Sequence, residues 1–157
     1  MDARNFHGWL YRRIIVKNIE RITGRRRDEE ELAYTTENIN KNISNFSAWH
    51  QRTVLLSEMF DRGEIENETK FIQDEFSYIT NAMFTDAEDQ SVWFYIKWFI
   101  KNSIVYDTLE SDEYISLLQE LRNNITVINQ DDFDFSGKQN NWCLKILIVL
   151  NDILKDL

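Results

Sequence analysis

A short motif centred on tryptophan recurs along this 157-residue chain, and it is the feature that most restricts the fold. The motif reads NFHGWLYRR at residues 5–13, NFSAWHQR at 45–52 and DQSVWFYIK at 89–97, with a degenerate copy at 140–146. Its tryptophans are spaced by 40, 44 and 49 residues, and they are Trp9, Trp49, Trp93 and Trp142. Periods of this length are typical of arrays of helical hairpins.

Each copy of the motif has the pattern of a helix start. Asn5, Asn45 and Asp89 stand four residues before the first three tryptophans. Asn and Asp are strong N-caps because the side-chain oxygen accepts from the free amides of the first turn. In the fourth copy Lys138 holds that place, and the cap is either Ser136 or Asn140.

Basic residues follow each tryptophan after three or four positions, which places them on the same helix face as the indole. We expect these side chains to bond helix ends or carboxylates of the adjacent hairpin. They are Arg12, Arg13, Arg52, Lys97 and Lys145.

Further helical patterns lie between the motif copies, over residues 28–43, 68–84 and 111–128, and 131–140 reads as a break. The chain has no proline and only four glycines, which also favours helix. No stretch alternates with period two. We therefore predict an all-α fold, a right-handed superhelical array (an α-α solenoid) of helical hairpins. We expect about seven helices in a single helical-repeat domain spanning 1–157.

The first motif copy lacks a preceding helix to act as its hairpin arm. The end of a helical array normally presents a polar outer face. Phe6, Leu10, Ile14 and Ile15, however, cannot all turn inward from one helix. The sequence therefore predicts either a piece of a longer solenoid or a partner bound over this end.

The charge of the chain limits the classes of partner. Its formal net charge is −9 and its pI about 4.7, which argues against nucleic acid or an anionic membrane as the main partner. The longest apolar run, ILIVL at 146–150, is too short to insert across a bilayer. The single cysteine, Cys143, rules out an internal disulfide framework. We expect a cytoplasmic protein.

The segments RNFHGWLYRR, SNFSAWHQR and DQSVWFYIKW resemble the repeats of protein prenyltransferase α-subunits. The general form of that repeat is Asn, an aromatic residue, a small spacer, Trp, two residues and Arg. The residues of these segments are most similar to those of the α-subunits of the Rab geranylgeranyltransferase (type II) group, particularly the fungal ones. FTDAEDQSVWFY at 84–95 resembles their last repeats. The resemblance suggests a C-terminal portion of such a subunit, starting at about the third of five repeats.

The resemblance implies a function that needs other chains. In this family a crescent of helical hairpins wraps around a β-subunit, which holds the zinc and most of the isoprenoid pocket. The enzyme transfers geranylgeranyl from its diphosphate to C-terminal cysteines of Rab GTPases, which an escort protein presents. We expect no cofactor on this chain, because His7, His50 and Cys143 lie in separate repeats and supply no zinc ligand set.

The resemblance also suggests individual site residues. Arg4 matches a lysine that faces the diphosphate in farnesyltransferase relatives, and its guanidinium can stabilise the charge of that leaving group. Asn45 is a second candidate on the catalytic side, and Phe6 and His7 are candidates for substrate contact. The alternatives are a solvated Arg4, a structural His7, and helix capping by Asn5 and Asn45, which we favour for the two asparagines.

The remaining motif residues read as structural, because tryptophans at repeat spacing usually anchor one hairpin on the next. This structural set comprises Asn5, Trp9, Arg12, Trp49, Arg52, Trp93 and Trp142. The run GRRRDEEE at 24–31 reads as a solvated loop and helix start, with partner docking as the alternative. The alternative function is a non-catalytic helical-repeat scaffold that binds a protein. A self-sufficient hydrolase lacks a nucleophile–base set.

Overall fold

The structure, a computed structural model, describes residues 6–157 and shows eight α-helices and no strand in that range. The prediction of an all-α chain built from helical hairpins is confirmed. The chain divides into two compact units, Met1–Glu66 and Asn67–Leu157. The single domain that we expected over 1–157 stays a prediction.

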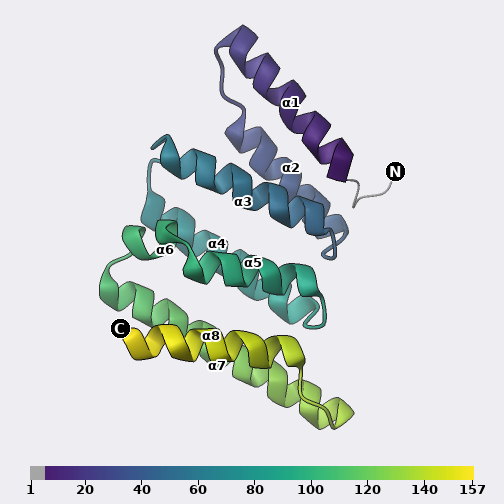
Figure 1. Cartoon of the computed structure of the whole chain (residues 1–157), viewed down its shortest axis with the longest axis vertical. Helices are drawn as coiled ribbons and strands as arrows, with labels where there is room; N and C mark the ends of the chain where they lie inside the picture. The colour runs from purple at the N-terminus through teal and green to yellow at the C-terminus, as the bar shows by residue number, and fades with distance from the viewer. Residues whose placement is uncertain (1–5) are drawn as a thin grey trace. The chain divides into compact units, whose positions relative to one another are not determined.

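The first unit contains α1 (Phe6–Thr23), α2 (Asp28–Lys41) and α3 (Phe46–Asp61). Helices α2 and α3 pack side by side as an antiparallel hairpin (Figure 1). Four acidic residues crowd the first turn of α2, where the positive end of the helix dipole stabilises them. Helix α1 packs on this hairpin and has no hairpin arm of its own among the described residues.

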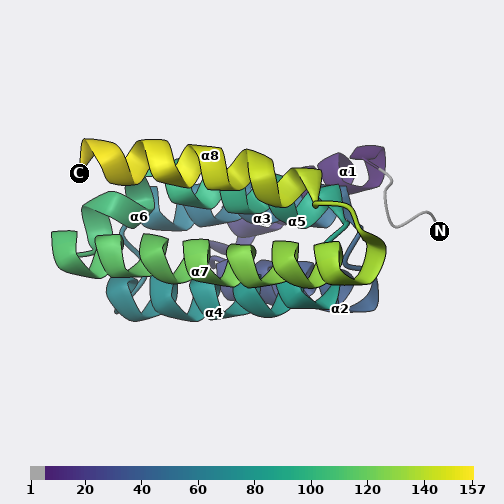
Figure 2. The same ribbon diagram turned by 90° about the horizontal axis from the view of Figure 1, so that it is seen from below.

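The second unit contains five helices, four of which form two further hairpins. They are α4 (Glu68–Thr85), α5 (Gln90–Lys101), α6 (Ser103–Thr108), α7 (Ser111–Ser136) and α8 (Asn141–Asp156). Helix α4 pairs with α5, and α7 pairs with α8. Within this unit α4 and α7 lie in one layer and α5 and α8 in the other (Figure 2).

Two features of the second unit differ from the sequence-based expectation. The short helix α6 raises the number of helices to eight in the described part of the chain, because Asn102 accepts from the amide of Ile104 and starts a new turn directly after α5. Helix α7 continues through the first six residues of the break expected at 131–140. It ends only where Gly137 takes the left-handed conformation (φ 72°) that favours glycine at a helix C-terminus.

Burial separates α1 from the other long helices. The hairpin helices contribute the largest fully buried side chains, among them Trp49, Trp93, Tyr95 and Phe99. Helix α1 has no buried residue in its described part. Its apolar side chains stay substantially exposed: Leu10 40%, Tyr11 67%, Ile14 51%, Ile15 40% and Ile22 79%. This agrees with the expectation for Leu10, Ile14 and Ile15, whereas the side chain of Phe6 lies outside the described residues.

In the described part of the chain, none of the helices is long and apolar enough to cross a bilayer.

Candidate functional site

The second and third motif copies build the same local structure in different units. In the first unit the Asn45 side chain caps α3 by accepting from the amide of Ala48 at 3.1 Å. The Trp49 indole, 1% exposed, donates to the carbonyl of Ile43 at 2.8 Å. The indole therefore fastens the loop that precedes its own helix, two residues before the cap.

In the second unit Asp89 caps α5 by accepting from the amide of Ser91 at 2.7 Å. The Trp93 indole, also 1% exposed, donates to the carbonyl of Ala87 at 2.8 Å. Ala87 stands two residues before its cap, as Ile43 does in the other copy. We call this arrangement of cap, buried indole and loop carbonyl the cap–indole unit. It supports the structural role that we predicted for Trp49 and Trp93.

The first motif copy is joined to the next helix through its basic residue. The Arg12 guanidinium donates from Nε and Nη2 to the two carboxylate oxygens of Glu31 on α2, at 2.9 and 2.8 Å. Its Cζ also lies 3.5 Å from the ring centre of Tyr34, which packs 5.4 Å from the half-buried Trp9. The expected bond to a carboxylate of the adjacent hairpin is therefore present at Arg12.

Arg52 bonds two hydroxyls of the other helix in its own hairpin. This buried guanidinium donates from Nη1 to the hydroxyls of Thr35 and Thr36, at 3.0 and 2.8 Å. Both threonines belong to α2, the partner helix in the same hairpin. The sequence missed this pair because threonine hydroxyls in a helix carry no signal of cross-helix bonding. The bond from Arg52 to a carboxylate or a helix end of the adjacent hairpin stays a prediction.

The fourth motif copy does not repeat the cap–indole unit. Asn140 is the cap of α8, accepting from the amides of Trp142 and Cys143, so Trp142 stands two residues after its cap and not four. The half-buried Trp142 ring lies 5.9 Å from Phe94, and the Lys145 ammonium lies 4.8 Å from its centre. Asn140 instead donates through Nδ2 to the carbonyl of Ala87 at 2.9 Å, and so links α8 to the loop before α5.

The candidate residues of the catalytic side are only partly described. Arg4 and Asn5 lie outside the described residues, as does the side chain of Phe6. His7 is exposed in the first turn of α1. Asn45 is fully buried, and its oxygen caps α3 by accepting from the amide of Ala48. Its place on the catalytic side stays a prediction.

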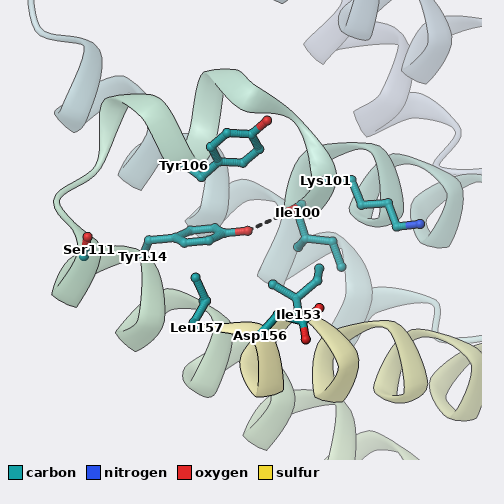
Figure 3. A pocket seen from close by; sticks show the side chains of 8 residues that line it. All are labelled: Ile100, Lys101, Tyr106, Ser111, Tyr114, Ile153, Asp156 and Leu157. Carbon is teal, nitrogen blue, oxygen red and sulfur yellow. Dashed lines mark hydrogen bonds between the residues drawn. The ribbon is translucent and has the colours of Figure 1, made fainter.

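An apolar pocket of about 570 Å³ lies in the second unit (Figure 3). It is lined by Ile100, Lys101, Tyr106, Ser111, Tyr114, Ile153, Asp156 and Leu157. The Tyr114 hydroxyl donates to the carbonyl of Ile100 at 2.9 Å, and Lys101 extends away from this ring. Burial raises the pKa of Tyr114, so its hydroxyl keeps the proton that it donates.

The single cysteine is buried in α8. Burial raises the pKa of the Cys143 thiol to about 12, which keeps it protonated and unreactive near neutral pH. Within residues 6–157 no three His, Cys, Asp or Glu side chains come together in a way that could hold a metal ion.

Comparison with known proteins assigns the hairpins to a family. Residues 28–59 and 72–103 match the protein prenyltransferase alpha subunit repeat, and these ranges correspond to the hairpins α2·α3 and α4·α5. The chain is 64% identical over 155 residues to the geranylgeranyl transferase type-2 subunit alpha of Saccharomyces cerevisiae, covering 99% of this chain and 47% of that protein.

Two other relatives share this name. The Schizosaccharomyces pombe protein is 34% identical over 99% of the chain, which covers 47% of that protein. The Homo sapiens protein is 35% identical over 69% of the chain, which covers 19% of that protein. The chain thus spans about half the length of the fungal relatives. The matched hairpins and the identity over nearly its whole length show that the chain belongs to the protein prenyltransferase alpha subunit family.

Proposed function

We propose that this chain provides part of the α-subunit of a Rab geranylgeranyltransferase and acts together with a β-subunit. The observation that supports the proposal most strongly is the 64% identity to a geranylgeranyl transferase type-2 subunit alpha over 99% of the chain. The substrates are geranylgeranyl diphosphate and the C-terminal cysteines of Rab GTPases, presented by an escort protein. The scaffold without chemistry, our other hypothesis, has no comparable support.

The chain contributes structure and electrostatics to this reaction. The thiolate sulfur of the Rab cysteine forms a bond to C1 of the prenyl group, and the C–O bond to diphosphate breaks with its electron pair leaving on the diphosphate. Arg4 is placed in our proposal beside that leaving group, where a guanidinium stabilises the developing charge. We assign the zinc to the β-subunit, as the family resemblance implies.

The cap–indole units serve the same proposal by keeping the helix starts rigid. Buried Trp49 fixes the loop before α3 through a 2.8 Å bond, so side chains near that helix start are held in one geometry. Preorganised donors act on a transition state without a reorganisation cost. These two motif copies are therefore proposed to act indirectly, by holding the starts of α3 and α5, and Arg4 before α1 is proposed separately as the charged group.

A chimera tests the proposal directly. This chain replaces the matching part of the Saccharomyces cerevisiae relative, and the chimera is expressed with the β-subunit and assayed with escort protein and Rab for geranylgeranyl transfer. We expect assembly and turnover. A folded chimera that does not bind the β-subunit would contradict the proposed function.

Arg4→Ala in the same chimera tests the role of Arg4. We expect kcat to fall by at least about tenfold with assembly unchanged, because one charge-stabilising donor is lost. Arg13→Ala is the matched control, an arginine in the same motif copy, and should leave kcat unchanged. Full turnover in Arg4→Ala would remove Arg4 from the mechanism and leave the subunit assignment intact.

A further inference from the structure

A basic pocket of about 400 Å³ lies in the first unit, where the end of α1, the loop after it and the residue that follows α3 come together. Its lining residues are Lys17, Glu20, Arg21, Gly24, Arg25, Arg26 and Arg62. Five of the seven are cationic, although the whole chain carries a charge of −9. The proposed prenyl transfer uses none of these residues.

The loop that carries two of the arginines has a fixed backbone. The amide of Gly24 donates to the carbonyl of Glu20 at 2.8 Å, and Gly24 adopts φ 69°, which favours glycine. The amide of Arg25 donates to the Thr23 hydroxyl at 3.3 Å, and the amide of Arg27 donates to the Glu20 carboxylate at 2.8 Å. The side chains at positions 25 and 26 therefore extend from a backbone that needs little further ordering.

Three of the five cations already have acidic partners. Lys17 Nζ lies 3.0 Å from Glu58 Oε1, and Arg26 Nε lies 3.4 Å from Glu64 Oε1. Arg62 Nη2 lies 2.5 Å from Asp28 Oδ2 and its Nε 3.3 Å from Glu64 Oε1. The pairs of Lys17 and Arg26 are open to water, with cation side chains 58% and 56% exposed, so solvent screens both and they exchange partners at low cost.

Arg21 and Arg25 differ from the other three cations. Neither has a carboxylate partner among residues 6–157, and both are exposed at the pocket. The one carboxylate in the lining, Glu20, accepts from the amide of Arg27. Two guanidinium groups in a concave site thus have no ion-pair partner among the described residues.

We propose that this pocket binds a phosphate group, held by Arg21 and Arg25 with Lys17 as a third donor. A guanidinium can donate two parallel N–H groups to one anion, which is called a bidentate pair. A carboxylate has two oxygens, so it accepts one such pair. A phosphate group has at least three oxygens and close to two charges near neutral pH, so it engages two guanidinium groups at once. The group is either a free phosphate or diphosphate or a phosphorylated side chain of a protein.

A structural role for these arginines makes a different prediction. Arg21 lies in the last turn of α1, where a cation interacts favourably with the negative end of the helix dipole. On that account Arg21→Gln lowers stability a little, and phosphate has no effect beyond that of salt. If the pocket is a phosphate site, binding must saturate with phosphate concentration and must weaken when either arginine is replaced.

The test is a titration of the whole chain with inorganic phosphate, diphosphate and a phosphoserine peptide, followed by calorimetry and amide NMR at constant ionic strength. We expect saturable binding with amide shifts at Gly24 and Arg25. Arg21→Gln and Arg25→Gln should each weaken it by about tenfold, because each removes a charge-assisted bond. Arg13→Gln, a change of the same charge in the same helix outside the pocket, should bind as the parent does.

Each outcome decides one point. Shifts that sodium chloride reproduces, or equal binding by Arg25→Gln and the parent chain, would overturn the site. A phosphoserine peptide that binds more tightly than diphosphate identifies a modified protein as the ligand, and the reverse order identifies the free anion. Arg25 lies in an exposed loop, so its variant keeps the fold even where Arg21→Gln disturbs α1. The titration does not depend on the prenyl-transfer assay, so a chimera without transfer activity would contradict the proposed function and not the phosphate site.

Discussion

The hairpins α2·α3 and α4·α5 share a cap–indole unit and differ three residues after the tryptophan. In α3 that position is Arg52, whose guanidinium bonds the hydroxyls of Thr35 and Thr36. In α5 it is Ile96, which is fully buried. Both hairpins thus share the cap–indole unit, but the residue three positions after the tryptophan is polar in one and apolar in the other. A buried polar residue is tolerated there when it finds hydrogen-bond partners, as Arg52 does.

The two units also differ in charge. From Phe6 to Glu66 the chain has ten basic and ten acidic residues, whereas from Asn67 to Leu157 it has seven basic and sixteen acidic ones. The second unit thus accounts for all of the −9 net charge. The acidic charge therefore disfavours anionic partners at the second unit. The first unit is neutral in sum, so a basic pocket on it can still attract an anion.

One of the two exchanges at the differing position, Ile96→Arg, should give the largest effect. Ile96→Arg places a charge without a partner in the core and should destabilise the chain by about 5 kcal/mol. Arg52→Ile should cost only about 2 kcal/mol, because Thr35 and Thr36 keep their bonds to the Leu32 carbonyl. Urea unfolding followed by circular dichroism measures both.

The control for this exchange is Ile148→Arg in α8, the same substitution at a residue that is 63% exposed. It should change the free energy of unfolding by less than about 0.5 kcal/mol. If Ile96→Arg and Ile148→Arg cost the same, α5 does not rely on an apolar contact at this position.

The tryptophans give the next largest effect. Trp49→Ala and Trp93→Ala should each destabilise by about 4 kcal/mol, because each opens a cavity and removes the indole's bond to a part-buried loop carbonyl. Trp142→Ala, at a half-buried residue outside a cap–indole unit, should cost about 1 kcal/mol. The same urea assay separates the two classes. If Trp142→Ala lowers the free energy of unfolding as much as Trp93→Ala does, Trp142 anchors its hairpin as strongly as an indole in a cap–indole unit.

The smallest effect is an acid sensitivity of the first unit through Asp28. Burial by itself would raise the pKa of Asp28, but hydrogen bonds with Glu64 and Arg62 and the charge of Arg62 outweigh it and lower the pKa. A lowered pKa in the folded state means that the stabilisation is present at neutral pH. It is lost as the pH falls from about 4 towards the folded value.

Asp28→Asn should therefore lower stability by about 1 kcal/mol at pH 7, and this loss should shrink as the pH falls below about 4 and the parent carboxyl takes up its proton. The measurement is the urea midpoint as a function of pH. Asp152→Asn, at an exposed site in α8, is the control in the second unit. Parallel curves for the parent and Asp28→Asn would show that the Asp28–Arg62 pair does not contribute.

Local signals in the sequence predicted most of the helix starts. The caps Asn45 and Asp89 and the choice between Ser136 and Asn140 came from residue type and spacing, and the structure selects Asn140. The end of α7 was predicted too early, because the acidic run at 131–134 reads as a loop although it contains no glycine or proline. Helix α6 was missed, since six residues are too few to show a helical period.

The sequence by itself determined the features that depend on neighbours along the chain: the caps, the tryptophan spacing and the family resemblance. Bonds between a cap and the next turn span only two or three residues, so they can be read directly. The tertiary structure alone decided which helix Arg52 bonds, that Trp142 lies outside a cap–indole unit, and that Arg62 joins Arg21 and Arg25 around one pocket. Such contacts depend on the rotation and offset of one helix against another, and these are set by how complete side-chain surfaces pack and not by any single spacing.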